Sequence, residues 1–396
     1  MPAARHRVGG ATARAVVAAP RVMVLAMGCC EATNPNLVGV VSEPSRATEQ
    51  EPGARQWPEP GVAWDRRTTL KGLVGAAGVI AVSGCAREPR DGMTGVRLAF
   101  CGQLLCVVPY EVSRVRGHFA EQGLAVELVY TRGGNAAMQA LVGGAVDYAG
   151  TSFDVALQAA ANGASIRRVA STGRLPLFAL ATAPEQAGAI DSVAALEDGT
   201  VGISALGNAD HALLLYLLDQ AGVEAGTVQF AAIGTNVFDA LRLGQVDAAM
   251  LQEPALSLIV EAGGRELINF MEIDEARRHL GGPYAFMGVS VRSAERDGRL
   301  PEIRRLAAGL AAGLVDTRTL PPLEIVAALP EALVAGGDID RLARVIDRYR
   351  LSLYPESVEV DVEAAGRVMR AQEVAGLLQP GRVDLEFLLD PGALAG

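Results

Sequence analysis

Residues 140–147 read ALVGGAVD and residues 240–247 read ALRLGQVD, so the frame Ala-Leu-x-x-Gly-x-Val-Asp occurs twice. In each copy an apolar helix face ends at a glycine, Gly144 or Gly244, and a short apolar strand follows. A glycine at this point can take the left-handed conformation that other residues resist. The repeat predicts two similar α/β lobes. The alternative is a single α/β domain in which the same helix-glycine-strand pattern recurs by chance.

Each repeat strand runs into a polar turn. The tripeptide Gly-Thr-Ser follows the first copy, and Gln-Glu-Pro follows the second. In open parallel sheets, ligands bind where strand ends meet helix starts, so two lobes would hold a ligand in the cleft between them. The ligand contacts expected in these turns are Thr151, Ser152, Gln252 and Glu253.

Composition narrows the function. The chain has 396 residues, half of them hydrophobic, and a net charge of −10, which argues against a nucleic-acid-binding surface. Lys71 is the only lysine. Chemistry that needs a lysine is therefore excluded from the chain beyond that position.

The first part of the chain does not have the pattern of a folded domain. Residues 1–64 are rich in Ala, Arg, Pro and Glu, and residues 43–60 show almost no apolar periodicity. Such composition is typical of disorder. The alternative is that the start of the reading frame has been assigned too early.

Residues 65–85 have the form of an export signal. Arg66 and Arg67 form a twin-arginine head, a short apolar run follows, and Val-Ser-Gly-Cys ends at Cys85 as in a lipobox. This predicts an extracytoplasmic lipoprotein, in the periplasm or at the cell surface, tethered to the membrane by lipidated Cys85. Both the twin-arginine and the general secretory route stay open, and the structural alternative is a small buried helix.

After a polar linker at 86–95, strands and helices alternate. We expect a first lobe at 96–183, with a loop from 101 to 109 before its first helix. A second lobe at 184–283 follows. Residues 284–396 are expected to return to the first lobe and to end in helices, so that chain crossings near residues 183 and 284 form a hinge.

Several loops place backbone N–H groups at helix starts, namely 150–152, 204–208 and 234–236. Such ends attract anions, although ordinary N-capping is the alternative for each. Arg174 is interpreted as a solvated turn residue, with an anion clamp as the alternative. The further residues expected to contact ligand are Gln103, Tyr110, Ser204, Gly207, Asn208, His211 and Thr235.

Four residues lie between Cys101 and Cys106 in the first strand-helix connection. They are interpreted as unpaired cysteines, and a local disulfide is the alternative in an exported protein. No second Cys/His cluster accompanies them, so no metal site is expected.

Residues 96–292 carry a set of short motifs in a fixed order. The motifs are GHFAEQGL at 117–124, Gly133-Gly134, the repeated Leu-x-x-Gly-x-Val-Asp, GNADH at 207–211, Val246-Asp247-Ala248 and Glu253-Pro254. Their order and spacing resemble the extracytoplasmic solute-binding proteins of ABC importers, in the branch that serves sulfonates, nitrate, taurine and pyrimidine thiamine precursors.

This resemblance implies a two-lobe periplasmic-binding-protein fold of α/β class, type II-like, with a mostly parallel sheet and flanking helices in each lobe. It also implies a monomer that binds a small anionic or heterocyclic solute without a cofactor. The implied partners are an ABC permease and its ATPase.

Two other functions were weighed. A related fold makes the thiamine pyrimidine with pyridoxal phosphate, which needs a Schiff-base lysine. Lys71 lies inside the expected export signal, so that enzymatic function is not supported. A ligand sensor that signals to a membrane protein stays open, because the sequence does not distinguish it from a transport protein.

Overall fold

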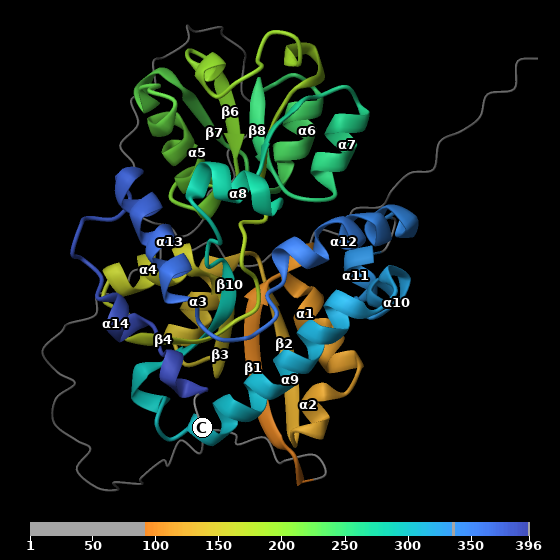
Figure 1. The fold of residues 1–396 in the computed structure, drawn as a ribbon, viewed down its shortest axis with the longest axis vertical. Helices are drawn as coiled ribbons and strands as arrows, with labels where there is room; N and C mark the ends of the chain where they lie inside the picture. Colours follow the sequence, from red (N-terminus) through yellow and green to blue (C-terminus); the bar gives the residue numbers. More distant parts are fainter. Residues whose placement is uncertain (1–91, 335–336, 395–396) are drawn as a thin grey trace, which may run out of the picture. The chain divides into compact units, whose positions relative to one another are not determined.

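The computed structural model describes residues 92–334 and 337–394. The expected N-terminal extension, the export signal with Arg66 and Arg67, and Cys85 lie outside the described residues. The described residues all belong to one compact unit, which contains two five-stranded sheets (Figure 1).

The first sheet has the strand order β2-β1-β3-β10-β4. Strands β1, β2 and β3 are parallel, whereas β10 runs antiparallel to both β3 and β4. The strands are β1 (Thr94–Cys101), β2 (Leu124–Thr131), β3 (Tyr148–Ser152), β4 (Ile166–Ser171) and β10 (Met287–Arg292).

The second sheet repeats this arrangement in the order β7-β6-β8-β5-β9, with β5 as its antiparallel strand. Its strands are β5 (Ala179–Thr182), β6 (Thr200–Ile203), β7 (Gln229–Ala232), β8 (Ala248–Leu251) and β9 (Glu266–Asn269). The predicted two-lobe α/β fold is therefore confirmed, with mixed sheets.

The lobe boundary differs from the expected one near residue 183. Strand β5 pairs with β8 and β9, so it belongs to the second sheet, and the chain leaves the first lobe between Ser171 and Ala179. All four residues of β5 are buried. An apolar pattern of this kind predicts a buried strand but does not indicate which sheet the strand joins. The return crossing lies between β9 and β10.

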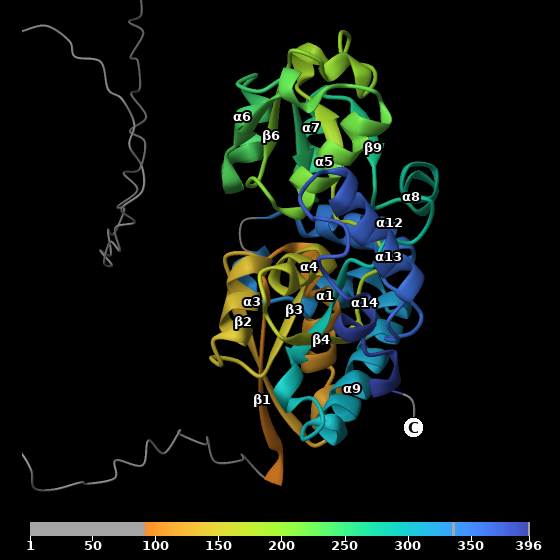
Figure 2. The same ribbon diagram turned by 90° about the vertical axis from the view of Figure 1, so that its left-hand side faces the viewer.

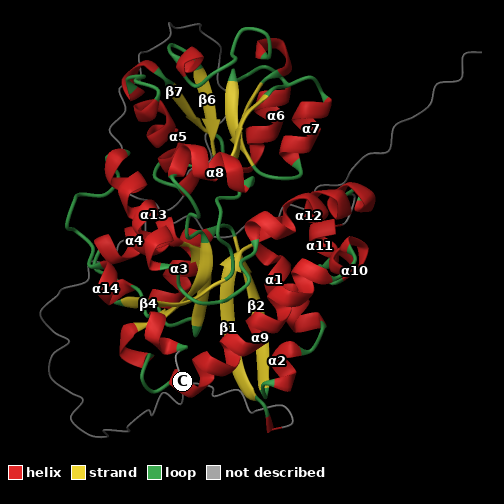
Figure 3. Cartoon of the chain, in the orientation of Figure 1, coloured by secondary structure: helices red, strands yellow, loops and turns green. Residues whose placement is uncertain are grey.

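Helices flank both sheets (Figures 1 and 3). Those up to the end of β10 are α1 (Leu104–Val115), α2 (His118–Glu121), α3 (Gly134–Val142), α4 (Phe153–Ala161), α5 (Ala209–Gln220), α6 (Val237–Arg242), α7 (Ala255–Glu261) and α8 (Ile273–Leu280). Those after it are α9 (Leu300–Thr319), α10 (Pro322–Ala327), α11 (Glu331–Val334), α12 (Ile339–Leu353), α13 (Val362–Val374) and α14 (Leu385–Leu388).

Helix α1 corrects the expected loop at 101–109. It begins at Leu104 and carries Pro109 in its interior. Proline supplies no N–H to the carbonyl four residues earlier, which here belongs to Leu105. The hydroxyl of Tyr354 donates to that buried carbonyl instead, at 2.8 Å. A contact about 250 residues away in the sequence therefore lets the helix tolerate its proline.

The repeat has the predicted local structure in both lobes. Gly144 and Gly244 have φ values of 77° and 66°, in the left-handed region. The repeat aspartates make matching bonds: Asp147 Oδ2 accepts from the backbone N–H of Arg97, and Asp247 Oδ2 from that of Thr200, each at 2.8 Å. Each carboxylate thus joins its own strand to the parallel neighbour, β1 or β6.

The C-terminal helices contact both lobes. Helix α13 packs against α4 of the first lobe and α5 of the second (Figure 2). Tyr349 and Ser352, both in α12, reach the segment that leaves the second sheet. The Tyr349 hydroxyl accepts from Asn269 at 2.9 Å, and Ser352 Oγ donates to the carbonyl of Met271 at 2.7 Å.

Candidate functional site

A cavity of about 500 Å³ is lined by residues from both sheets. Seven of the residues expected to bind ligand contribute to its wall: Gln103, Ser152, Ser204, Asn208, Thr235, Gln252 and Glu253. The structure thus brings together polar residues from turns spread over about 150 residues of sequence.

The wall is built from equivalent loops of the two lobes. The chain enters a helix after β1 and β6, after β2 and β7, and after β3 and β8, and residues of all these connections line the cavity. In the pairs of helices α1 and α5, α3 and α6, and α4 and α7, one member comes from each lobe. Their starts, where N–H groups lack intrahelical partners, therefore border the same space.

The capping residues differ among these helices. Ser152 is an ordinary N-cap of α4, since its Oγ accepts from the N–H of Val155 at 3.4 Å. Gln103, Gly133 and Asn208 precede α1, α3 and α5 without a side-chain capping bond. The side chains that precede these three helices therefore do not cap first-turn N–H groups.

Two carboxylates of the wall are already hydrogen-bonded within the protein. Asp210 accepts from the backbone N–H of Ser204 at 2.5 Å and from its Oγ at 2.8 Å. Burial raises the pKa of Asp210, while the bonds from Ser204 oppose that rise. Glu253 accepts from the N–H and Oγ of Ser257, at 3.1 and 3.0 Å. Glu253 is thus an N-terminal anchor of α7, as well as part of the wall.

Arg132 is the basic side chain among the described residues that line the cavity. It is exposed, follows β2 directly and precedes Gly133, the residue before α3. Within the described part of the chain no ion pair or hydrogen bond ties down its guanidinium. The sequence analysis did not select Arg132; its place between a strand end and the Gly133-Gly134 pair was the available signal.

Two hydrogen bonds between side-chain amides connect the lobes beside the cavity. Gln252 Nε2 donates to Gln103 Oε1 at 2.9 Å, and Asn135 Nδ2 donates to Asn208 Oδ1 at 3.0 Å. In each pair one residue follows a strand of the first sheet and the other a strand of the second. Sequence reasoning had selected three of these four residues and missed Asn135.

Four expected ligand contacts do not line the cavity: Tyr110, Thr151, Gly207 and His211. Tyr110 is fully buried, stacks on Phe100 and hydrogen-bonds the Thr172 hydroxyl at 3.0 Å. Tyr110 lies on the apolar face of α1, so its ring packs in the core.

Thr151 directly precedes Ser152 in β3 and is fully buried. Its hydroxyl has no hydrogen-bond partner among the described residues. His211 is a buried loop-anchoring residue, since its Nδ1 accepts the N–H of Gly207 at 3.0 Å. His211 therefore holds the turn before α5 instead of contacting ligand. Burial also lowers the pKa of His211.

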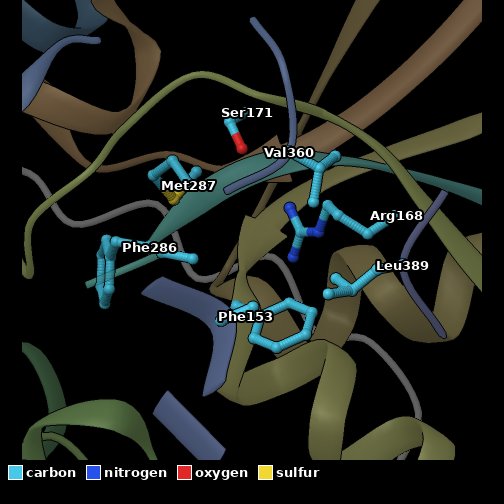
Figure 4. A pocket seen from close by; sticks show the side chains of 9 residues that line it. Phe153, Arg168, Ser171, Phe286, Met287, Val360 and Leu389 are labelled. Carbon is cyan, nitrogen blue, oxygen red and sulfur yellow. The ribbon is translucent and has the colours of Figure 1, made fainter. Parts of the chain in front are cut away.

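A buried arginine holds the end of β3. Arg168 donates to the carbonyls of Thr151 and Ser152, at 3.0 and 3.1 Å. Figure 4 shows its guanidinium near the ring of Phe153, beside a cavity of about 10 Å³ that Phe286 and Met287 also line. Burial lowers the pKa of Arg168 to about 10. Arg168 thus fixes the backbone of Ser152, a residue of the cavity wall. Its role was not predicted from the sequence.

Arg174 lies outside the cavity wall. It donates to the carbonyls of Ser352 and Leu351 near the end of α12, at 2.8 and 2.7 Å. It is therefore neither an anion clamp nor a free turn residue. Its partners lie far away in the sequence, so no local pattern pointed to them.

The apolar part of the wall comes from both lobes. It includes Val155, Phe178, Phe238, Met250, Leu251, Phe286 and Met287. The cavity therefore combines a polar rim of helix starts with an apolar surface that suits the carbon skeleton of a ligand.

This arrangement is a two-lobe α/β fold with a cavity at the strand ends. Residues 107–277 match the family model described as NMT1/THI5 like. No curated protein matches the chain by sequence.

Solved structures share the fold. A protein of Bordetella bronchiseptica RB50 superposes with a TM-score of 0.67 at 21% identity, covering 76% of this chain and 95% of that one. The alkanesulfonate-binding protein SsuA from Xanthomonas axonopodis pv. citri, bound to MOPS, has a TM-score of 0.59 at 19% identity and coverages of 75% and 98%.

The periplasmic nitrate-binding protein NrtA from Synechocystis PCC 6803 has a TM-score of 0.59 at 12% identity and coverages of 76% and 87%. Together with the family match, these structures confirm the resemblance to the extracytoplasmic binding proteins of ABC importers.

Two features are absent from the described residues. No helix in 92–334 or 337–394 has the length and apolar character needed to cross a membrane. Over the same residues, no group of three or more His, Cys, Asp or Glu side chains is placed to hold a metal ion.

Proposed function

We propose that this protein binds a small solute with an anionic group outside the cytoplasm and delivers it to the permease and ATPase of an ABC importer. The observation that carries the proposal is the cavity at the starts of α1, α3 and α5, where the side chains of Gln103, Gly133 and Asn208 make no capping bond. Backbone N–H groups at helix starts favour anions.

The charges of the wall support an anion over a cation. Asp210 and Glu253 are neutralised in part by donors from Ser204 and Ser257, whereas Arg132 has its guanidinium available. An anion entering the cavity would therefore find donors and one positive charge. A cation would find two carboxylates that already accept two bonds each.

The size of the cavity supports a ligand larger than nitrate. A volume of about 500 Å³ falls in the range of sites that bury drug-sized molecules. The anionic group would meet the helix starts and Arg132, and a carbon skeleton would pack on Phe178 and Phe286. The sulfonate-binding neighbour that holds MOPS supports this class of ligand for the fold.

Binding would favour the arrangement in which both lobes contact the solute. A ligand that touches both lobes stabilises the closed state only by its differential affinity for that state. The amide pairs Gln103–Gln252 and Asn135–Asn208 would contribute to the same state. The protein would act as a monomer, tethered through Cys85 after export directed by Arg66 and Arg67.

A thermal-shift screen tests the proposal. The full chain is measured with alkyl and aryl sulfonates, taurine, nitrate, pyrimidines and aromatic carboxylates. A ligand at one hundred times its dissociation constant should stabilise the folded protein by about 2.7 kcal/mol. We expect the largest shift with a sulfonate or carboxylate that carries an apolar group, and none with the corresponding uncharged alcohol. Stabilisation by amines alone would contradict the proposal.

The sensor alternative needs a separate measurement, because it uses the same cavity. Uptake of the identified ligand by cells should fall when the gene is deleted and recover with the wild-type chain. Unchanged uptake combined with a lost transcriptional response would favour sensing.

A further inference from the structure

Cys101 and Cys106 both line the cavity, and the proposed binding of a solute gives neither cysteine a role. Cys101 is the last residue of β1 and Cys106 lies in the first turn of α1. Both side chains are buried from bulk solvent, with 5% and 2% exposure, yet both line the cavity. Their thiols are free, and each lies near enough to the other to shift its pKa.

The pair is coupled to the contact between the lobes through Gln103. The Cys106 thiol donates to Gln103 Oε1 at 3.7 Å, and the same oxygen accepts from Gln252 Nε2 at 2.9 Å. Gln103 is one of the four residues that lie between the two cysteines in the sequence. Any change in the bonding of the thiols therefore reaches the residue that touches the opposite lobe.

The two thiols are chemically unequal. The neighbouring Cys106 side chain lowers the pKa of Cys101, whereas burial raises the pKa of Cys106 well above its ordinary value. A thiolate is the nucleophile in thiol–disulfide exchange. Cys101 is therefore the attacking residue of the pair and Cys106 the resolving one.

We propose that Cys101 and Cys106 form a reversible dithiol–disulfide pair, oxidised inside the cavity by a small-molecule disulfide. The Cys101 thiolate attacks one sulfur of the disulfide, the S–S bond breaks, and the first thiolate leaves. Cys106 then gives its proton to solvent and attacks Cys101 Sγ, which expels the second thiolate. Two cysteine thiols are oxidised, and one external disulfide is reduced to two thiols.

Oxidation changes the environment of Gln103. A disulfide has no S–H, so Gln103 Oε1 loses the donor from Cys106 and keeps only Gln252. The bond also links the end of β1 to the first turn of α1. The redox state of the pair thereby sets the position of a loop that lines the ligand cavity.

The test uses the folded full chain, oxidised glutathione and mass spectrometry. After oxidation and alkylation of free thiols, cleavage at arginine gives the peptide 98–114, which contains both cysteines and no other cysteine. We expect this peptide unalkylated and lighter by two hydrogen atoms than its dithiol form, and restored by dithiothreitol. A peptide alkylated at both cysteines, or one that keeps glutathione, would overturn the proposal.

A second measurement addresses the link to Gln103. In glutathione redox buffers, Gln103→Ala should raise the equilibrium ratio of disulfide to dithiol about two- to fivefold, because it removes a bond made only by the dithiol form. The exposed Gln139→Ala on α3 is the control and should leave the ratio unchanged. Equal ratios for wild type and Gln103→Ala would show that the redox state of the two cysteines is not coupled to Gln103. Neither measurement depends on the identity of the solute.

Discussion

The hydroxyl of Tyr354 donates a hydrogen bond of 2.8 Å to the main-chain oxygen of Leu105. This oxygen faces the turn of α1 in which Pro109 has no N–H to offer. Both partners are buried, with Leu105 3% and Tyr354 2% exposed. The C-terminal part of the chain therefore completes the backbone bonding of the first helix beside the cavity.

We expect Tyr354→Phe to lower the free energy of unfolding by about 1–3 kcal/mol, because it leaves the Leu105 carbonyl buried without a donor. Denaturant unfolding measures this. The control is Tyr216→Phe, a half-buried tyrosine of α5, which should change stability by less than about 0.5 kcal/mol. Equal effects of the two substitutions would show that the Leu105 carbonyl finds another donor.

The repeat aspartates should affect stability and not affinity. Asp247→Ala removes the acceptor for the N–H of Thr200 and for Gln186 Nε2, so we expect a loss of about 1–3 kcal/mol in the free energy of unfolding. Asp147→Ala should have a similar effect in the first lobe, where Arg97 and Arg299 are the partners. The dissociation constant of the solute, measured by calorimetry on folded protein, should stay within about twofold for Asp247→Ala. A large loss of affinity at unchanged stability would contradict the structural role.

Arg132→Ala should weaken binding of an anionic solute by about 10- to 100-fold, the effect of losing a hydrogen bond to a charged group. The wild-type affinity should also fall with added salt more steeply than that of the variant. Arg370→Ala is the matched control, because Arg370 is exposed on α13 and does not line the cavity. If Arg132→Ala and Arg370→Ala bind alike, the guanidinium at the cavity does not contact the ligand.

Asp154 should make stability depend on pH. Burial raises its pKa to about 6, from an ordinary 3.8, against the opposing bonds from Gln372 and Tyr284. The folded protein therefore holds this proton more tightly than the unfolded chain does. The resulting stabilisation is complete below about pH 4 and is lost as the pH rises through about 6.

The variant Asp154→Asn isolates this effect. The free energy of unfolding of the wild type, minus that of the variant, should fall by about 2–3 kcal/mol between about pH 4 and pH 7. Urea titrations at several pH values give the difference. A difference that stays constant over this range, or rises with pH, would be inconsistent with a proton held on Asp154.

Cys85→Ser should move the protein from the membrane fraction to the soluble fraction if Cys85 carries the lipid. Replacing both Arg66 and Arg67 by lysine should block export by the twin-arginine route, since that route requires the pair. Fractionation with antibody detection reads out both variants. Membrane retention of Cys85→Ser would rule out lipid anchoring at this residue, and normal export of the double variant would indicate the general secretory route.

The fold was accessible from the sequence because its main signals are local. A glycine with positive φ ends each repeat helix, and a buried strand follows at Tyr148 or Ala248. These features depend on residues close together in the chain. The order and spacing of motifs then pointed to a family of binding proteins, and the family match over residues 107–277 and the shared fold of the solved structures agree with that resemblance.

The candidate site was accessible only in part. Loops at helix starts led to seven residues of the cavity wall, since strand-end turns meet at one edge of a parallel sheet. Tyr110 and His211 were assigned to the cavity, yet one packs in the core and the other anchors a loop. The spacing of apolar residues predicts that a helix has an apolar face. It does not predict which polar groups near that face point into solvent.

The sequence by itself determined the two α/β lobes, the helix-ending glycines and the loops from which a site can be built, because these follow from contacts between neighbouring residues. Only the tertiary structure decided that β5 joins the second sheet, that Tyr354 serves the helix interrupted by Pro109, and that Arg132 lines the cavity with no partner among residues 92–334 and 337–394. These three outcomes depend on pairings between distant segments, which are settled by how the two lobes and the C-terminal helices pack together.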